Sequence, residues 1–495
     1  MSLALVHTRA RTGITAPEVA VEVHLSNGLP SLNIVGLPET AVKESKDRVR
    51  SALLNAHFEF PRRRITVNLA PADLPKEGGR FDLAIAIGIL AASGQLPGDA
   101  LESHELLGEL ALSGTLRAIE GVLPAALAAA RAGRNLIVAA GNAQEAALAR
   151  NACVHGAGHL LEVCAHLRGE TRLERHPYTP PQITAGGPDL NEVVGQHQVR
   201  RALEIAAAGG HNLLLSGPPG TGKTMLASRL PGILPPLDEA EAIEVAAIHS
   251  VAGLQREDFF RRPFRAPHHS ASPAALVGGG TLPRPGEISL AHCGVLFLDE
   301  LPEFPRRVLE VLRQPLESGR VAIARVQSRI EFPARFQLIA AMNPCPCGYL
   351  GEARCRCTPD QIGRYRARLS GPLQDRIDLQ VTAPRVAQSE LTQPSTGEPS
   401  SAVRARVLAA RRRQAERQGG LNCTLSPTEL QRHCPLDQEQ RNLLNTAAER
   451  LGLSARAFHR LLRVARTLAD LDASEHPGTG HLTEALGYRV ALTGR

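Results

Sequence analysis

The segment Leu213–Thr224, which reads LLLSGPPGTGKT, limits the architecture of this chain more than any other. An apolar run leads into Gly217, and after four residues Gly222-Lys223-Thr224 begin a helical run, MLASRL. A strand, a glycine-rich loop and a helix in this order form a P-loop, whose backbone N–H groups surround phosphates. Lys223 would add positive charge at the β- and γ-phosphates, and the Thr224 hydroxyl would bind Mg²⁺. The predicted nucleotide-binding residues are therefore Gly217, Pro218, Pro219, Gly220, Thr221, Gly222, Lys223 and Thr224.

Two further apolar runs end in polar residues that suit nucleotide hydrolysis. Val295–Leu298 is followed by Asp299 and Glu300, and Gln337–Met342 is followed by Asn343. We expect Asp299 to bind Mg²⁺ or its water, and Glu300 to act as the general base that activates the attacking water. Asn343 would position that water, although an asparagine before a proline is also typical of a turn.

Length and composition divide the chain into parts. With 495 residues it is expected to hold two to four domains. Residues 1–175 mix strand-like and alanine-rich helical runs, 189–387 follow an α/β pattern, and 402–495 are strand-poor and helical. The segments 176–188 and 388–401 have the composition of linkers. The predicted fold is α/β, with an α+β amino-terminal domain, a P-loop core with a parallel sheet, and a helical carboxyl-terminal domain.

Charge and hydropathy indicate which partners and which location to expect. The net charge is +7, from 56 basic and 49 acidic residues, which is compatible with a polyanionic partner but does not require one. The longest apolar stretch, Leu83–Ala92, is about half a membrane span, so no membrane partner is expected. The amino terminus lacks the pattern of a secretory signal, and we expect a cytoplasmic protein.

Four cysteines are clustered directly after Asn343. Cys345 and Cys347 are separated by seven residues from Cys355 and Cys357, and without a secretory signal such a cluster suggests a metal before disulfides. Residues i and i+2 of an extended backbone point to the same side, so each pair presents two thiolates together. Four thiolates would close a tetrahedral structural zinc site. Zinc sites usually contain CxxC rather than CxC, and four free thiols are the alternative.

Longer segments resemble one protein family. The P-loop and the strand ends are those of an AAA+ ATPase. The connecting text closely resembles the ComM/YifB proteins, a bacterial branch of the magnesium-chelatase-like AAA+ ATPases, in VVGQHQVRRALEIAAAGGHNLLL, FRAPHHSASPAALVGGGTLPRPGEISLAHCGVLFLDELPEF and LIAAMNPCPCGYLG. The resemblance covers essentially the whole chain. It implies ATP and Mg²⁺ as cofactors, a homo-hexameric ring, a Lon-protease-like S5 domain in 1–175 and a helical lid in 402–495.

The resemblance also implies roles for arginines. A neighbouring subunit's arginine finger stabilises charge on the transferred phosphoryl group, and Arg376 in GPLQDRIDL matches that segment, with Arg368 as the alternative. A second catalytic arginine, sensor 2, should begin a helix of the lid. Arg456 fits this position, and Arg460 and Arg463 on the same helix are alternatives.

DNA contacts are implied by position in the family rather than by the residues alone. The text VAIARVQSRIEFP occupies the place of a hairpin that projects towards the ring channel, so Arg325 and Arg329 would contact the nucleic-acid backbone. Solvated loop arginines are the alternative. Gly278–Gly280 would belong to a second insert that faces the channel.

The amino-terminal domain should lack peptidase activity. Lon-like peptidases use a serine and a lysine, but Arg80 occupies the serine position in LPKEGGRFDLAIAIG. The segment RAIEGVLPAALAAARAG, which resembles the one that carries the lysine, contains none. This domain is therefore expected to be a scaffold or to face nucleic acid.

The sequence thus favours an ATP-driven hexameric DNA motor. The resemblance implies a helicase that promotes branch migration while incoming DNA is integrated in natural transformation. The alternatives are the ATPase subunit of a magnesium chelatase that acts on a porphyrin, and an ATP-dependent protein remodeller.

Overall fold

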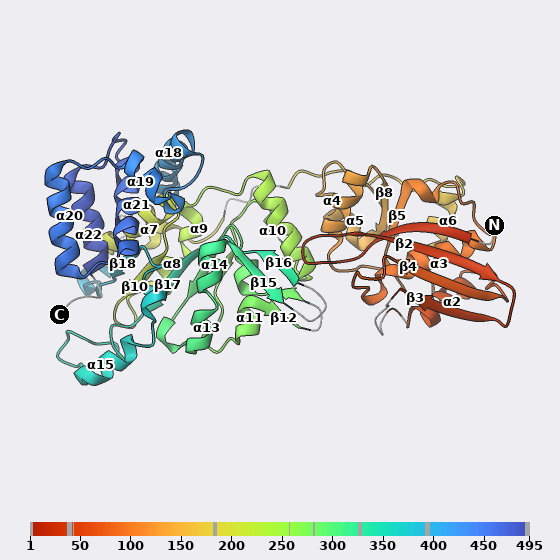
Figure 1. The fold of residues 1–495 in the computed structure, drawn as a ribbon, viewed down its shortest axis with the longest axis horizontal. Coiled ribbons are helices and arrows are strands. Elements are labelled where there is room, and N and C mark those ends of the chain that lie inside the picture. The colour runs from red at the N-terminus through yellow and green to blue at the C-terminus, as the bar shows by residue number, and fades with distance from the viewer. Residues whose placement is uncertain are drawn as a thin grey trace. The chain divides into compact units, whose positions relative to one another are not determined.

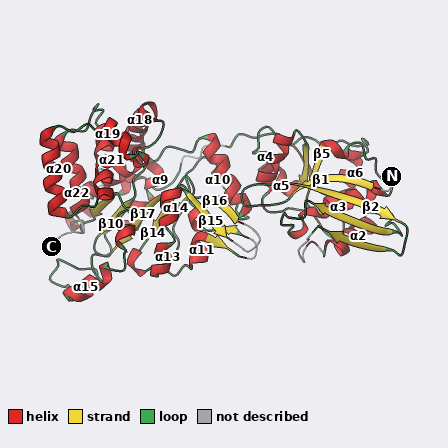
Figure 2. Ribbon diagram, viewed as in Figure 1, coloured by secondary structure: helices red, strands yellow, loops and turns green. Residues whose placement is uncertain are grey.

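The computed structural model describes residues 3–36, 42, 44–181, 186–256, 258–280, 283–324, 329–391 and 397–490. These residues form two compact units (Figures 1 and 2). The first unit combines Met1–Gln182 with Glu239–Phe259 and Val326–Phe332, and the second combines Ile183–Asp238, Phe260–Arg325 and Pro333–Arg495. Both contain helices and a sheet, which confirms the predicted α/β class.

In the first unit, the described strands form a seven-stranded sheet in the order β3-β4-β2-β1-β5-β8-β9. β2 pairs with β1 and β4 in antiparallel fashion, whereas β5, β8 and β9 run parallel. The bounds are β1 Leu3–Arg9, β2 Glu18–Ser26, β3 Ser31–Val35, β4 Arg64–Ala70, β5 His104–Leu107, β8 Asn135–Ala139 and β9 Cys153–Ala157. A separate antiparallel pair consists of β6 Glu109–Leu110 and β7 Leu116–Arg117. The helices are α2 Ser45–Asn55, α3 Asp82–Ala92, α4 Val122–Ala132, α5 Ala140–Ala146, α6 Leu160–Leu167 and α10 Glu239–Val251.

The longest apolar stretch of the sequence lies in helix α3, in which every residue is buried. Gly88 allows this helix to approach the sheet, because a Cβ atom at that position would lie 2.6 Å from Val23 Cγ2. The apolar run is thus explained by the core of the first unit. Among the described residues, no helix combines the length and the hydrophobicity that crossing a membrane requires. Arg80, at the position expected for a catalytic serine, is buried and donates a hydrogen bond of 2.6 Å to the Glu120 carbonyl.

In the second unit, a parallel sheet of five described strands has the order β11-β14-β17-β10-β18. Its bounds are β10 Leu213–Ser216, β11 Phe264–Arg265, β14 Val295–Leu298, β17 Gln337–Met342 and β18 Leu379–Thr382. All residues of β10, β14 and β17 are buried, which accounts for their continuous apolar runs, since helices cover a parallel sheet on both faces. Ser216 pairs with Met342 and Leu298 with Ala340, so the carboxyl ends of these strands meet at one edge.

The helices of the second unit surround this sheet and continue into a helical carboxyl-terminal segment, drawn in blue in Figure 1. The helices that precede this segment in the chain are α7 His197–Gly209, α8 Lys223–Ser228, α9 Leu230–Ile233, α11 Pro273–Val277, α12 Glu287–Leu290, α13 Arg306–Glu310, α14 Arg313–Ser318, α15 Pro359–Arg366, α16 Gly371–Gln374 and α17 Gln388–Leu391. The carboxyl-terminal helices are α18 Ser400–Gln418, α19 Pro427–His433, α20 Gln438–Leu451, α21 Ala455–Leu471 and α22 Thr479–Val490. Short strands complete the unit, namely β12 Gly278–Gly279, β13 Arg284–Pro285 and β15 Arg320–Ala324; β16 covers Arg329–Pro333.

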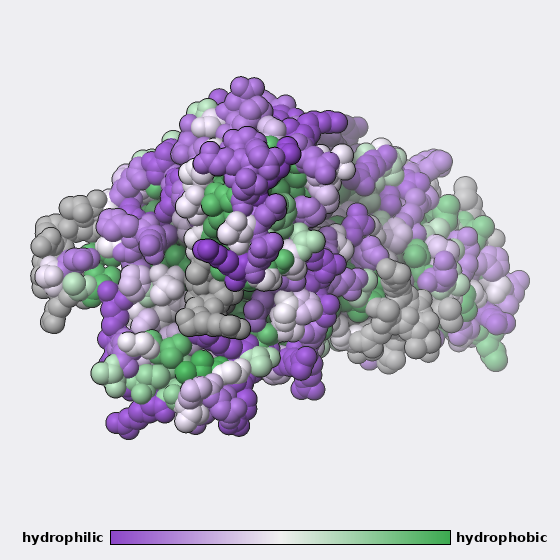
Figure 3. Space-filling model, turned by 60° about the vertical axis from the view of Figure 1, so that its left-hand side comes forward, coloured by the Kyte–Doolittle hydropathy of each residue, from purple (hydrophilic) through white to green (hydrophobic). Residues whose placement is uncertain are grey.

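The carboxyl-terminal helices share one hydrophobic core with the P-loop sheet. Leu203 of α7, Val407 of α18 and Leu468 of α21 are fully buried in the same cluster as Leu215 of β10. Hydrogen bonds add to this packing, because Gln414 donates to the Ala208 carbonyl at 3.1 Å. On the surface, Figure 3 shows mainly hydrophilic residues, with hydrophobic ones in separate groups. The carboxyl-terminal helices are therefore held on the sheet by a continuous apolar interior.

Candidate active site

The P-loop lies between β10 and α8, at the edge where the strand ends meet. The ammonium group of Lys223 donates hydrogen bonds to the carbonyls of Gly217 at 2.7 Å and Pro218 at 3.0 Å, and to Asn343 Oδ1 at 3.2 Å. Burial lowers the pKa of Lys223, while the nearby acidic groups Asp299 and Glu300 oppose this shift. The structure therefore brings the P-loop lysine and Asn343 into direct contact.

The two predicted magnesium ligands are also in contact. Thr224 Oγ1 donates a hydrogen bond of 2.5 Å to Asp299 Oδ2, and the backbone N–H of Glu300 donates to Asp299 Oδ1 at 2.9 Å. Thr224 is exposed and Asp299 is half-buried. Hydroxyl and carboxylate oxygens suit Mg²⁺, which is usually bound by one or two protein groups together with substrate phosphates.

Glu300 adopts a backbone conformation that is unusual for its residue type. Its φ is 52°, in the left-handed region, where a residue with a Cβ atom is strained; such strain is often found at functional sites. The Glu300 carboxylate lies 3.4 Å from His269 Nδ1. The His269 ring packs against that of His268, with ring centroids 4.0 Å apart and the ring planes tilted by 34°. Sequence reasoning missed His269, for which the adjacent histidines of FRAPHHSAS were the available signal.

Contacts around the P-loop hold its conformation. Gly220 and Gly222 have φ values of +79° and +78°. Buried Gln196, just before α7, donates hydrogen bonds to the carbonyls of Thr221 at 3.3 Å and Pro384 at 2.7 Å. The loop is thereby linked to the segment that follows β18. Gln196 was not singled out from the sequence, because its partners are far away in the chain.

The two candidate arginine fingers differ in exposure. Arg376, just before β18, has a side chain only 7% exposed; it forms an ion pair with Glu317 and donates to the Pro372 carbonyl at 2.5 Å. The Arg368 side chain is 52% exposed and donates to Glu303 Oε2 at 2.8 Å. Arg376 would have to leave Glu317 to reach a neighbouring subunit, whereas Arg368 is already at the surface.

The sensor 2 candidates lie on α21, which begins after the N-cap residue Ser454. Arg456 is exposed in the first turn of this helix. Arg460 donates to Asp378 Oδ1 at 2.6 Å, and Arg463 donates through Nε to the Leu425 carbonyl at 2.9 Å. Arg460 and Arg463 therefore bind groups of the fold itself, and Arg456 is the candidate with an exposed side chain.

The predicted nucleic-acid contacts are only partly described. Arg325 lies outside the described residues, and of Arg329 the structure gives the backbone at the start of β16. The second insert contains an antiparallel pair in which Gly278 of β12 is opposite Pro285 of β13.

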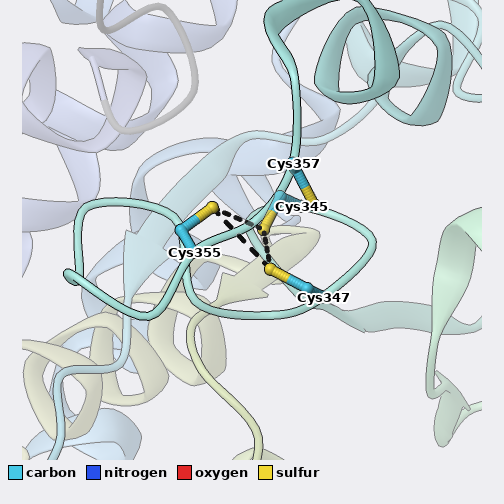
Figure 4. A group of neighbouring side chains, drawn as sticks. All are labelled: Cys345, Cys347, Cys355 and Cys357. Atoms are coloured by element: carbon cyan, nitrogen blue, oxygen red, sulfur yellow. Dashed lines mark hydrogen bonds between the residues drawn. The ribbon is translucent and has the colours of Figure 1, made fainter.

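The four cysteines lie together in the segment between β17 and α15 (Figure 4). The Sγ atom of Cys345 lies 3.4 Å from that of Cys347 and 3.9 Å from that of Cys355, and Cys347 and Cys355 are 3.7 Å apart. With Cys357, the four sulfur atoms all lie within 4.8 Å of one another. A tetrahedral thiolate site with Zn–S bonds of about 2.3 Å has sulfur atoms about 3.8 Å apart. The cluster can therefore hold a metal ion.

The surroundings shift the pKa values of thiols in this cluster in different directions. Backbone N–H groups of Arg356 and Tyr349 lower the pKa of Cys347 to about 6. A backbone hydrogen bond from Cys347 favours the Cys357 thiolate, but burial and the neighbouring sulfur atoms raise the pKa of Cys357 to about 11. The neighbouring sulfur atoms thus oppose a further negative charge at Cys357, and a cation bound by the cluster would offset this repulsion.

Three family models match consecutive parts of the chain. The model described as magnesium chelatase, subunit ChlI, matches residues 189–391. The model for subunit ChlI of Mg-chelatase matches residues 21–142, and the model for its C-terminal part matches residues 397–489. The P-loop sheet and the carboxyl-terminal helices thus fall within matched segments.

Some relatives match nearly the full length of this chain. The chain is 55% identical to the uncharacterized protein YifB of Salmonella typhimurium, over 99% of this chain and 97% of the relative. It is 54% identical to the competence protein ComM of Haemophilus influenzae, over 99% of this chain and 98% of the relative. The magnesium-chelatase 38 kDa subunit of Cereibacter sphaeroides is 25% identical, over 61% of this chain and 91% of the relative.

Proposed function

The chain belongs to the ComM/YifB family of magnesium-chelatase-like proteins, and on this basis we propose that it is an ATP-driven motor that moves along DNA as a hexameric ring. ATP hydrolysis is supported by one observation above all. Two hydrogen bonds connect residues that follow three different strands: Lys223 bonds to Asn343, and the adjacent Thr224 bonds to Asp299. This is the set of groups that phosphoryl transfer needs for charge neutralisation and for positioning.

The proposed chemistry follows from these contacts. Lys223 exchanges its contacts with carbonyls and Asn343 for the β- and γ-phosphates of ATP. Mg²⁺, held by the Thr224 hydroxyl and the Asp299 carboxylate, neutralises phosphate charge when bound. Glu300 accepts a proton from the attacking water, and Asn343 holds that water in line with the phosphate. His269 fixes the Glu300 carboxylate in the required direction.

Assembly into a ring would complete each site with a residue of the neighbouring subunit. We assign this role to Arg376, whose guanidinium would stabilise the charge that develops on the γ-phosphate. Its partner Glu317 has a side chain 55% exposed, so the carboxylate of this ion pair lies at the surface of the unit and Arg376 would become available when the pair breaks. Arg368 is the alternative, and Arg456 would contact the nucleotide from the lid within its own subunit.

DNA is proposed as the track from the resemblance to the ComM/YifB family, one member of which is named a competence protein. We propose that the motor promotes branch migration in the cytoplasm, where incoming DNA is integrated during natural transformation. Arg325 and Arg329 would contact phosphates, which position a strand without reading its sequence. The net charge of +7 is compatible with such a partner.

We also propose that Cys345, Cys347, Cys355 and Cys357 hold a structural zinc ion. Four protein thiolates fill a tetrahedral coordination sphere, so no position remains for a substrate. Protein purified without chelator should contain about one zinc ion per chain by elemental analysis. Protein that is free of zinc after such a purification would leave four ordinary thiols.

One experiment separates this function from its alternatives. The ATPase rate is measured alone and with forked DNA, single-stranded DNA, protoporphyrin or casein. We expect DNA to stimulate hydrolysis and the other two additions to have no effect. Stimulation by protoporphyrin alone would indicate a chelatase subunit, and stimulation by casein alone would indicate a protein remodeller.

A further inference from the structure

The segment that carries the four cysteines, residues 345–357, lies directly against the P-loop. We call it the cysteine loop. Its Gly348 has a φ of +83°, and a Cβ atom there would lie 2.7 Å from Pro219 Cδ and 3.8 Å from Asn343 Cγ. Only a glycine fits this approach without displacing the P-loop proline. The cysteine loop therefore forms part of the wall that supports the P-loop and Asn343.

A second set of contacts ties the same loop to the end of β18. The Tyr349 ring packs under two guanidinium groups, with Arg354 at 3.8 Å and Arg385 at 5.6 Å from its centroid. Glu352 accepts hydrogen bonds from Arg354 at 2.6 Å and from Arg385 at 3.1 Å. Arg385 follows Pro384, whose carbonyl is held by Gln196, the residue that also binds the P-loop carbonyl of Thr221. The cysteine loop is thus connected to the P-loop in two ways. Gly348 contacts Pro219 directly, and Glu352 is linked to Thr221 through Arg385, Pro384 and Gln196.

The cysteine loop contains no helix or strand among its residues, all of which are described. Its backbone is shaped by turns, such as the hydrogen bond from the Gly348 N–H to the Cys345 carbonyl at 2.9 Å. Ordering a segment of this kind costs conformational entropy. In Figure 4 the sulfur atoms of both arms of the loop converge, so an ion bound there would join the two arms across the turn that carries Gly348.

We propose that the thiolate metal centre is a positioning device for the ATP site. A bound zinc ion fixes the cysteine loop, and the loop in turn holds Pro219 and Asn343 in the conformation that binds the phosphates. The centre takes a soft divalent ion, because four thiolates select zinc over magnesium or calcium. This inference rests on the proposed ATPase function and predicts that affinity for ATP depends on the metal and on the fit of Gly348.

The test compares two glycines of the same loop. Gly348→Ala and Gly351→Ala both place a Cβ atom on a left-handed backbone, with φ values of +83° and +88°. At Gly351, however, nothing lies within 4 Å of the added atom. Gly351→Ala therefore reproduces the backbone strain without the collision at Pro219. Zinc content is measured by elemental analysis, and the Kd for ATP is measured by calorimetric titration.

We expect Gly348→Ala to keep its zinc and to weaken ATP binding about tenfold relative to Gly351→Ala, the usual scale of an overpacked contact. Removal of zinc from the wild type should raise the Kd as well, and added Zn²⁺ should restore it. Equal ATP affinity in the two glycine variants, or in zinc-free and zinc-loaded wild type, would overturn the inference. A wild type that binds ATP no better than Lys223→Ala would instead refute the proposed ATPase function, so the two failures are distinguishable.

Discussion

The Thr224 hydroxyl donates a hydrogen bond of 2.5 Å to the Asp299 carboxylate, although 75 residues separate them in the chain. The contact arises because β10 and β14 both flank β17 and run parallel to it. Asp299 directly follows the carboxyl end of β14. Thr224 follows the glycine-rich loop that leaves the carboxyl end of β10. Parallel sheets gather ligand-binding groups at this edge, and here the two groups are those that would share one Mg²⁺.

His269 offers a test of how Glu300 is oriented. Loss of its ring removes the group 3.4 Å from the Glu300 carboxylate, so His269→Ala should lower kcat for ATP by about tenfold or more while the Kd for ATP is unchanged. The comparison is His268→Ala, because this ring bonds to Ser270 at 2.8 Å and its loss removes only packing from His269, so its effect on kcat should be smaller. Equal kcat values for the two variants would remove His269 from the mechanism.

A mixing experiment tests the arginine finger. Arg376→Ala should bind ATP normally and hydrolyse it about 10³-fold more slowly or worse, as expected when an arginine finger is lost. Added to wild-type subunits, it should inhibit more than in proportion to its share, because each altered subunit disables a neighbour. Arg368→Ala is the comparison. If Arg368→Ala inhibits in this way and Arg376→Ala gives only proportional loss, the assignment moves to Arg368.

The DNA contacts are tested by salt dependence. Binding of single-stranded DNA should weaken with salt by a log–log slope of about −0.7 for each phosphate contact. The double variant Arg325→Ala/Arg329→Ala should flatten this slope by about 1.4 and remove DNA stimulation, while basal ATPase is retained. The variant Arg432→Ala/Arg450→Ala removes the same charge from exposed positions of the carboxyl-terminal helices and should leave the slope unchanged. An unaltered slope in the first variant refutes the channel assignment.

The buried His211 predicts how stability depends on pH. It bonds to Thr467 Oγ1 at 2.8 Å, and burial lowers its pKa to about 4, against the opposing charge of Asp378 and with help from Arg463 and Arg460. The unfolded chain takes up a proton near the ordinary value of about 6.5, whereas the folded chain does not. Stability should therefore fall as the pH drops from about 6.5 to about 4, by up to about 3 kcal/mol.

Urea unfolding followed across this pH range measures the effect. His211→Gln retains a hydrogen-bonding group towards Thr467 but cannot titrate, so its stability should vary less with pH than that of the wild type. The same pH dependence in both proteins would show that other groups are responsible.

Part of the site could be predicted from the sequence, because its residues lie at the ends of the strands of a parallel sheet. Lys223, Asp299 and Asn343 each follow an apolar run, and parallel strands bring such residues together whatever the loops between them. Other features depend on packing that no local pattern encodes. The contact of Gly348 with Pro219 and the bond from Gln196 to Thr221 join segments that are distant in the chain.

The burial of Arg376 and the division of the chain into two units also could not be predicted from local sequence patterns. Nothing in GPLQDRIDL indicates that Arg376 is buried against Glu317. Helix α10 groups with the first unit although it lies within the predicted 189–387 segment, since Leu123 of that unit donates to Ser250 Oγ at 3.4 Å. Such pairings depend on tertiary contacts, whereas strand, loop and helix signals are local.

The most direct test of the motor is strand displacement on a labelled branched DNA, with the wild type and Glu300→Gln compared at equal ATP binding. The wild type should displace the labelled strand only with hydrolysable ATP and Mg²⁺. Glu300→Gln should bind ATP and DNA, hydrolyse at least about 10²-fold more slowly, and leave the branch in place. A wild type that hydrolyses ATP but never displaces the strand, or a Glu300→Gln variant that displaces it equally fast, would contradict an ATP-driven DNA motor.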